Sequence, residues 1–326
     1  MIYPEYLKDN DTVGITACSC GVLKKIDRYE KSISNFRKKG FNIIETNNVR
    51  TDGIVSSDPV TRWNELTSLL LNKDVKMINI ASGGDFLYEM LPLVDYDLIK
   101  DNVKWIGGSS DPTSLLFTIT TKLDIATVYT PCNMAGYDHN ELHDSLNNYF
   151  DIVKGNNVRQ CKYDKYELND SDNDGYNLDT VNNWNNINGN VDESGIIIGG
   201  CIECIKDIIG TKFDNVNSFI EKYKDEGIIW YFDVFAMGPE ALYNTLLQFK
   251  NAGWFKYAKA ILIGKVKYVP EYSCTTYEDI IKKAVDIPCV YKFDIGHVKP
   301  SFTIINGSRV HVVSNDNEGY IDILTK

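Results

Sequence analysis

A glycine- and serine-rich segment of this 326-residue chain has the residue types of a nucleophile site. Residues 107–113 read Gly-Gly-Ser-Ser-Asp-Pro-Thr and lie between an apolar run at 103–106 and a helical apolar pattern at 115–119. This order predicts a strand, a sharp turn and a helix, with Ser110 in the turn. A serine in such a turn is lifted off the end of a sheet, beside the N–H groups at the start of a helix. Ser110 is therefore the candidate nucleophile.

A serine hydroxyl is a weak nucleophile and needs a base, and the chain has four histidines. His297 follows Gly296 at the end of a strand-like run, where a loop would deliver an imidazole to a cleft. Its position alone fits a general base or a structural residue equally well. His311 lies within a predicted strand, so we expect a structural or surface role. His139 and His143 are four residues apart, but their order differs from the HExxH of zinc peptidases, which favours a loop or helix end.

Asp233 ends the apolar run at 228–232, which is a predicted strand. A carboxylate at that point is either a capping or loop residue or the group that fixes the tautomer of a histidine. The order Ser110, Asp233, His297 along the chain matches the nucleophile, acid and base of α/β hydrolases.

The eight cysteines are scattered, and several lie in apolar or strand-like runs. This pattern favours reduced thiols in a cytoplasmic protein. Cys201 and Cys204 have CxxC spacing, but no second pair accompanies them, so we expect no metal at this motif. The sequence predicts no metal site and no cofactor.

The chain is acidic, with 45 Asp and Glu against 34 Lys and Arg and a net charge of −11. Such a balance argues against nucleic acid or an anionic membrane surface as a partner. The N-terminus lacks the basic and apolar regions of a signal peptide, and no apolar run approaches the roughly 18 residues that span a bilayer.

Strand and helix signals alternate through the first 130 residues or so, which predicts an α/β fold with a doubly wound parallel sheet. The expected domains are a nucleophile-bearing α/β domain at 1–155, a polar linker at 156–194 and a smaller, strand-rich α/β domain at 195–326. The tail predicts two hairpins, with strands at 302–305, 309–313 and 320–324. In a parallel sheet the loops at the carboxyl ends of the strands carry the site.

Seven segments in order resemble the LD-carboxypeptidase family of serine peptidases, which includes the microcin C immunity peptidases. The resemblance covers nearly the whole chain, and the segments that carry it are residues 8–15, 75–85, 91–99, 108–113, 198–201 with 210–211, 228–233 and 296–297. The resemblance implies Ser110 as nucleophile, His297 as general base and Asp233 in place of the family's glutamate.

The resemblance also implies an oxyanion hole made by the backbone N–H groups of Gly84 and Asp111. Ser109 stands where the family has Tyr or Phe, which removes an aromatic wall from the expected substrate site. Trp184, in the polar linker, fits either a substrate-facing aromatic or a loop anchor.

The resemblance implies a hydrolase that cleaves a peptide or amide bond beside a free carboxylate, with a muropeptide as substrate. Two alternatives stay open: an immunity peptidase for a peptidyl-nucleotide antibiotic, and a ligand-binding homologue without catalysis. We expect a cytoplasmic homodimer whose partner is a small peptide or peptidyl-nucleotide substrate, without nucleic acid or membrane.

Overall fold

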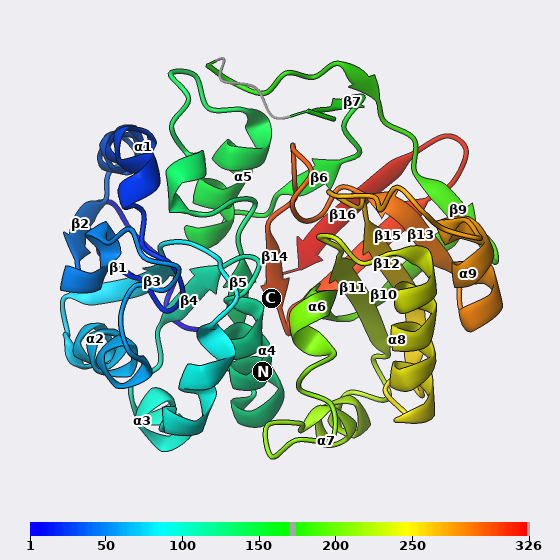
Figure 1. Cartoon of the computed structure of the whole chain (residues 1–326), viewed down its shortest axis with the longest axis horizontal. Helices are drawn as coiled ribbons and strands as arrows, with labels where there is room; N and C mark the ends of the chain where they lie inside the picture. Colours follow the sequence, from blue (N-terminus) through cyan, green and yellow to red (C-terminus); the bar gives the residue numbers. More distant parts are fainter. Residues whose placement is uncertain (170–173, 325–326) are drawn as a thin grey trace.

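Six strands form the first sheet of the computed structural model, which describes residues 1–169 and 174–324 (Figure 1). The sheet order is β14-β5-β4-β3-β1-β2, and β1 to β5 are mutually parallel. The strands are β1 (Thr12–Thr16), β2 (Asn42–Glu45), β3 (Val75–Ile80), β4 (Trp105–Gly108), β5 (Thr127–Tyr129) and β14 (Ile304–Asn306). The predicted parallel sheet is confirmed.

Helices cover both faces of this sheet because alternate strand residues are apolar on each side. Val13 packs with α1 residues such as Phe36 in one buried cluster, whereas α2 residues such as Leu69 belong to the other. The helices of this half are α1 (Ile26–Lys38), α2 (Pro59–Leu71), α3 (Tyr96–Asp101), α4 (Thr113–Leu123) and α5 (Asp144–Val153). Short 3-10 helices lie at Leu23–Lys25, Asn47–Arg50, Leu87–Leu93 and Met134–Gly136. The 3-10 helix at Leu87–Leu93 contains Pro92.

The second sheet has eight strands in the order β6-β16-β15-β10-β11-β12-β13-β9. Its centre, β10 to β13, is parallel, and antiparallel strands flank it on both sides. Its strands are β6 (Arg159–Cys161), β9 (Asn185–Ile187), β10 (Val191–Cys201), β11 (Ile228–Asp233), β12 (Ala258–Gly264), β13 (Cys289–Phe293), β15 (Arg309–Ser314) and β16 (Gly319–Leu324). The helices of this half are α6 (Ile202–Ile205), α7 (Val216–Lys222), α8 (Pro239–Asn251) and α9 (Tyr277–Ala284).

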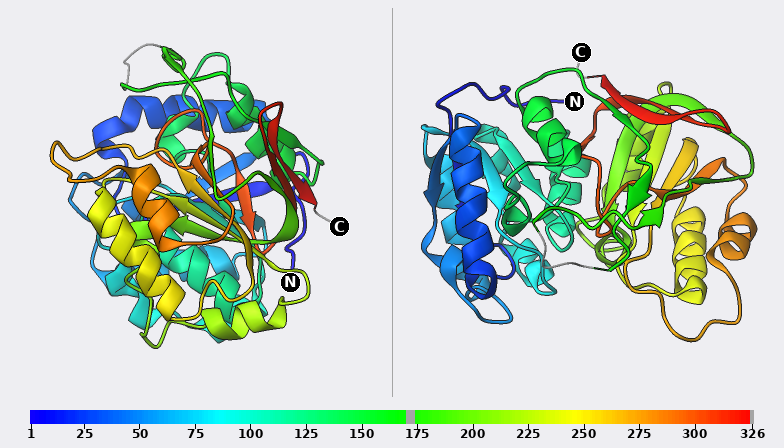
Figure 2. Two further views of the ribbon diagram at one scale, coloured as in Figure 1. Left: turned by 90° about the vertical axis from the view of Figure 1, so that its right-hand side faces the viewer. Right: turned by 90° about the horizontal axis from the view of Figure 1, so that it is seen from above.

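Helix α4 lies between the two halves and is buried along nearly its whole length. Phe117 of α4 lies 6.4 Å from Trp230 of β11 and 6.0 Å from Trp254, measured between ring centroids. Figure 2 (right) shows the two halves side by side, with the blue and cyan part next to the yellow and red part. The helix that follows Ser110 therefore belongs to the cores of both halves.

Two expectations differ from the structure. The predicted hairpin between residues 302–305 and 309–313 is wrong, because β14 pairs with β5 of the first sheet. Of the two hairpins predicted in the tail, the one formed by β15 and β16 is present. Asn306, at the end of β14, ties this first-sheet strand to the second half. Its buried side chain accepts hydrogen bonds from the Gly199 N–H and from the Tyr231 hydroxyl.

The polar segment at 156–194, expected as a linker, holds more structure than a linker needs. Its strands β6 and β9 form the two edges of the second sheet, and β7 (Lys165–Tyr166) pairs with β8 (Thr180–Val181). These strands lie at sheet edges, which need few apolar residues, so their asparagine-rich sequence lacks the apolar pattern that predicts a strand. The domain limits at 155 and 195 stay a prediction.

Candidate active site

Ser110 sits in the turn between β4 and α4, in a strained backbone conformation. Its φ is +68°, in the left-handed region that an L-residue other than Asn or Asp seldom adopts. Such strain is typical of a nucleophile turn, because it pushes the side chain out over the end of the sheet. Gly83 passes so close that a Cβ there would lie 2.9 Å from the Ser110 Cβ. The strand, turn and helix predicted around Ser110 are present.

Ser110, His297 and Asp233 form one hydrogen-bonded chain. The Ser110 Oγ lies 3.0 Å from His297 Nε2, and the His297 Nδ1 lies 2.8 Å from Asp233 Oδ2. The three residues come from three places in the fold: the end of β4, the loop after β13 and the end of β11. The geometry is that of a nucleophile, a base and an orienting carboxylate.

Asp233 is completely buried, yet its surroundings favour the carboxylate form. Burial on its own would raise the pKa of this carboxyl, but the imidazole of His297 and the hydroxyl of Tyr129 outweigh it, so the pKa lies below its ordinary value. The backbone N–H of His297 also donates to Asp233 Oδ1, at 3.1 Å. An ionised Asp233 holds the His297 proton on Nδ1 and leaves Nε2 free to accept one from Ser110.

Gly296 allows the aspartate to approach the histidine loop this closely. Its φ is +103°, and a Cβ at this position would lie 1.9 Å from Asp233 Oδ1. Ser301 Oγ accepts the Gly296 N–H at 2.8 Å and so fixes the loop from the other side. Asp233 is one methylene shorter than the glutamate that the resemblance implies, and the absence of a side chain at Gly296 lets the loop of His297 come close enough to reach it.

Gly84 and Asp111, the residues expected to supply oxyanion donors, flank the nucleophile turn. Gly84 has a φ of +152°, and a Cβ there would lie 2.4 Å from Ser19 Oγ. The Asp111 carboxylate accepts hydrogen bonds from Ser19 Oγ at 2.5 Å and from Leu87 N–H at 2.9 Å. Burial raises the pKa of this carboxyl. Within residues 1–169 and 174–324, the backbone N–H groups of Gly84 and Asp111 have no hydrogen-bond acceptor.

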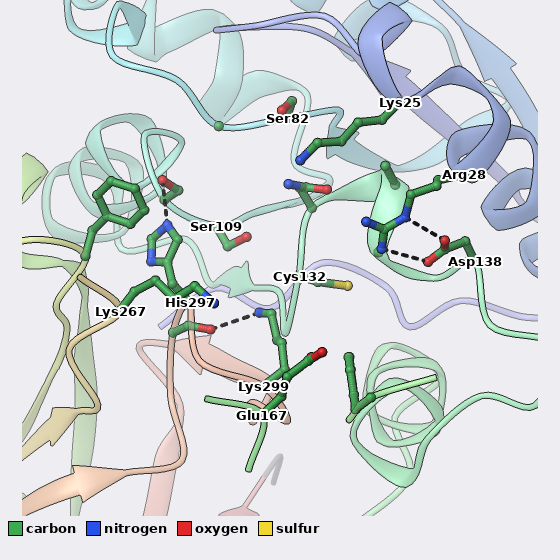
Figure 3. Close-up of a pocket in the computed structure, with 18 of the residues that line it drawn as sticks. Lys25, Arg28, Ser82, Ser109, Cys132, Asp138, Glu167, Lys267, His297 and Lys299 are labelled. Carbon is green, nitrogen blue, oxygen red and sulfur yellow. Dashed lines mark hydrogen bonds and ion pairs between the residues drawn. The ribbon is translucent and has the colours of Figure 1, made fainter. Parts of the chain in front are cut away.

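Gly84, Ser110 and His297 are among the residues that line a cavity of about 580 Å³, which Figure 3 shows. Ser109, Ser110 and His297 line its inner end, which agrees with the expected placement of Ser109. Phe235 adds an aromatic wall: its ring centroid lies 4.6 Å from that of His297 and 5.0 Å from that of Tyr268. Phe235 and Tyr268 thus supply aromatic surface on the side of the base.

Trp184 is not among the residues that line this cavity, and its contacts fit the loop anchor, one of the two roles that the sequence left open. Its indole N–H donates to the buried Asp294 at 3.1 Å, and its ring packs 4.5 Å from that of Phe293. Asp294 also forms a buried ion pair with Lys265. The carboxylate of Asp294 therefore draws the indole inward, and Trp184 anchors its loop.

Two side chains around the site, Tyr129 and Glu203, could not be assigned from the sequence. Tyr129 bonds Asp233 through its hydroxyl and resembles any apolar strand residue in the sequence. Glu203, inside the CxxC motif, accepts the backbone N–H groups of residues 235–237 at 3.0 to 3.1 Å and so shapes the loop that carries Phe235. Only the position of Tyr129 at a strand end hinted at a role.

The other candidate histidines lie outside the hydrogen-bonded chain of the site. His143 caps α5 by accepting the Ser145 N–H, His139 is buried beside the Tyr176 ring, and His311 pairs with Asp192. Cys201 and Cys204 are free thiols. Among the described residues, no group of three or more His, Cys, Asp or Glu side chains could hold a metal ion.

The helices described here are all too short or too polar to cross a membrane.

Residues 13–130 match the LD-carboxypeptidase N-terminal domain, and residues 194–312 match the LD-carboxypeptidase C-terminal domain. The chain belongs to the LD-carboxypeptidase family. Both matched regions contain site residues: Ser110 lies in the first, and Asp233 and His297 lie in the second. Members of this family are peptidases, which agrees with the cavity and its serine.

A curated relative is similar over nearly the whole chain. A protein of Vibrio cholerae serotype O1 that carries the name of a carboxypeptidase is 24% identical over 327 residues, 95% of this chain and 94% of that protein.

Two solved structures of the LD-carboxypeptidase fold are also similar. The microcin C7 self-immunity protein MccF, in complex with aspartyl sulfamoyl adenosine, has a TM-score of 0.85 at 22% identity, over 100% of this chain and 99% of that chain. The muramoyltetrapeptide carboxypeptidase of Oxalobacter formigenes has a TM-score of 0.74 at 19% identity, over 96% of this chain and 98% of that chain.

Proposed function

We propose that this protein is a serine carboxypeptidase that removes a terminal D-amino acid from a muropeptide. The single observation that carries the proposal is the chain from Ser110 through His297 to Asp233, with distances of 3.0 and 2.8 Å. The family membership makes a peptide with a free terminal carboxylate the first substrate to test.

The reaction follows from these contacts. Ser110 Oγ attacks the scissile carbonyl carbon and passes its proton to His297 Nε2, which forms a tetrahedral oxyanion. The N–H groups of Gly84 and Asp111 stabilise that oxyanion, a contribution of several kcal/mol in comparable sites. His297 then protonates the leaving amine, and the acyl group remains on Ser110. A water molecule, activated by His297, hydrolyses the ester and restores the serine.

Asp233 acts in this scheme as a positioning residue. Its carboxylate holds the imidazole in the tautomer that accepts a proton at Nε2, and it stabilises the imidazolium that forms after the transfer. Tyr129 keeps the carboxylate ionised, because its hydroxyl donates to Asp233 Oδ2.

Turnover of an L,D-tetrapeptide by the wild-type protein and by Ser110→Ala tests the proposal. We expect release of the terminal D-amino acid by the wild type and none above background by the variant, with an unchanged melting temperature. Equal turnover by both proteins would exclude Ser110 as nucleophile. Binding of the peptide without turnover by the wild type would favour the non-catalytic alternative.

An immunity peptidase is the second candidate function. It is favoured by the fold that the chain shares with MccF, whose structure holds aspartyl sulfamoyl adenosine. The same protein sample should be assayed against an aminoacyl phosphoramidate of a nucleotide. A larger kcat/KM for that compound than for the tetrapeptide would assign the chain to this second function.

We also propose that the protein acts as a homodimer in the cytoplasm. The eight cysteines are all free thiols, as expected in a reducing compartment. Light scattering on the purified protein tests the dimer, and a monomer at micromolar concentration would contradict it.

A further inference from the structure

The cavity has a basic wall that the proposed chemistry does not use. Lys25, Arg28 and Lys31 line it and lie three residues apart at the start of α1. Residues spaced by three or four share one face of a helix, so these side chains form a single row. Figure 3 shows Lys25 extending from α1 into the cavity, with Arg28 beside it. We call this row, Lys25, Arg28 and Lys31, the α1 wall.

One cation of the α1 wall is neutralised and two are not. The Arg28 guanidinium donates to both oxygens of Asp138, at 2.6 and 3.1 Å. The ammonium groups of Lys25 and Lys31 have no hydrogen-bond or ion-pair partner in the part of the chain that the structure describes. Two lysines without an ion-pair partner among the described residues thus line the cavity of a protein with a net charge of −11.

The position of Lys25 is unfavourable for the helix itself. Lys25 is the N-cap of α1, and no side chain caps this end. The N-terminus of a helix carries a partial positive charge, so stability favours Asp, Ser or Thr there rather than a lysine. The Ile26 N–H at the start of α1 already donates to Leu23 O of the preceding 3-10 helix. The Lys25 ammonium, which lines the cavity, is therefore the group here that favours a ligand of negative charge.

Acidic groups of the cavity lie away from the α1 wall or already have partners. Asp233 is bonded to His297, and Asp174 accepts the backbone and side-chain N–H groups of Asn140 at 3.0 and 2.7 Å. Glu167 is buried in the segment that bonds Lys299 through the backbone. The carboxylates of Asp174 and Asp233 are therefore engaged elsewhere, and Lys25 and Lys31 of the α1 wall are suited to an anion.

We propose that the α1 wall binds a carboxylate or phosphate on the part of the substrate remote from the scissile bond. This inference rests on the proposed function, because it takes Ser110 as the place of bond cleavage. One cavity of about 580 Å³ holds both Ser110 and the α1 wall, so a single extended substrate would reach both. The substrate class is thus an amide of an acidic peptide or of a phosphorylated compound, rather than a neutral peptide.

Matched substrate pairs test this site. The first pair is an L,D-tetrapeptide with a free side-chain carboxylate and the same peptide with that side chain as a primary amide. The second pair is an aminoacyl nucleotide and the corresponding aminoacyl nucleoside, which lacks the phosphate. Lys25→Gln and Lys31→Gln should each raise the KM for the anionic member by about threefold relative to the neutral member, as for an exposed ion pair. The double variant should give roughly tenfold, and the effect should shrink with added salt. The pair that responds more identifies the anion.

Lys24→Gln is the matched control, because Lys24 lies beside Lys25 in sequence but does not line the cavity. It removes the same charge and should leave the KM ratio of both pairs unchanged. The proposal would be overturned if the ratio of the KM for the anionic member to the KM for the neutral member were the same in the wild type and the double variant for both pairs. It would also be overturned if Lys24→Gln shifted this ratio as much as Lys25→Gln or Lys31→Gln does. Calorimetric binding of the four compounds to Ser110→Ala, with and without the two lysines, gives the same answer without turnover. Failure of the proposed function, which is seen as no wild-type turnover, is thereby distinguished from failure of the α1 wall.

Discussion

The hydroxyl of Tyr129 donates to the Oδ2 of Asp233 and so connects a residue of the first sheet to one of the second. The same hydroxyl accepts the backbone N–H of Ser110 at 3.1 Å. One phenol therefore contacts both the nucleophile turn and the carboxylate that orients the base. Because the Ser110 N–H is engaged in this way, the proposed oxyanion hole relies on the N–H groups of Gly84 and Asp111.

Tyr129→Phe should lower kcat by about tenfold, equal to about 1.4 kcal/mol of barrier, because His297 is then less firmly held. It should also change the pH dependence of stability. The pKa of Asp233 lies below its ordinary value, so its stabilising effect is present above the unfolded pKa of about 3.9 and is lost as the pH falls through the lower folded pKa. Removing the Tyr129 donor raises the folded pKa and reduces this effect.

The difference in unfolding free energy between the wild type and Tyr129→Phe should thus be largest above about pH 4 and shrink below it. Denaturant unfolding at several pH values measures it. Tyr149→Phe is the control, because it removes another buried hydroxyl, bonded to Asn79 and not to a carboxylate. A difference that does not depend on pH in either variant would show that Tyr129 does not act through Asp233.

Asp233→Asn should lower turnover by roughly 10⁴-fold with little change in melting temperature, since an amide favours the wrong imidazole tautomer. Asp233→Glu restores the family's residue but adds a methylene to a fully buried site. We expect it to be partly active and far better than Asp233→Asn. Normal turnover by Asp233→Asn would mean that another group orients His297.

Gly296→Ala should abolish most activity and reduce stability, because its Cβ would lie 1.9 Å from Asp233 Oδ1. Gly189→Ala is a matched control: Gly189 also has a positive φ, +119°, but a Cβ there would meet no atom within 4 Å. The control should cost about 1 kcal/mol of stability and no activity. Similar kinetics for the two variants would show that the approach of Asp233 to the loop is unimportant.

Trp184→Phe should destabilise the protein by about 1–3 kcal/mol, because Asp294 loses a hydrogen-bond donor, and should leave KM nearly unchanged. Trp63→Phe serves as the control, since the Trp63 indole N–H has no hydrogen-bond partner in the described parts of the chain. A KM increase without loss of stability in Trp184→Phe would favour the substrate-facing role, the other of the two that the sequence left open. Thermal unfolding and initial-rate kinetics separate the two outcomes.

The sequence was sufficient for the features that depend on local order. The alternation of strands and helices predicted the parallel sheet, and the strand-turn-helix order around Ser110 predicted its exposed turn. The ends of the strands β11 and β13 place Asp233 and His297 at one edge of a sheet, but position alone left their roles open, and only the family resemblance implied an acid and a base.

Features that depend on distant partners could not be predicted in this way. The apolar residues of β14 would suit a hairpin or a first-sheet strand equally, and Asn306 decides between them only through contacts made across the fold. Trp184 in a polar loop looks exposed until Asp294 is placed beneath it. The lysines of α1 look like an ordinary solvated helix face until the cavity is known.

The position of β14 has a consequence for how substrate enters. The chain passes directly from His297 to β14, which is hydrogen-bonded to β5 beside Ser110's own strand. The base and the nucleophile are therefore fastened to the same sheet by a stretch of a few residues. Ser110 Oγ and His297 Nε2 lie 3.0 Å apart, so the proposed nucleophile and base need no closing motion of the two halves to meet when a substrate enters.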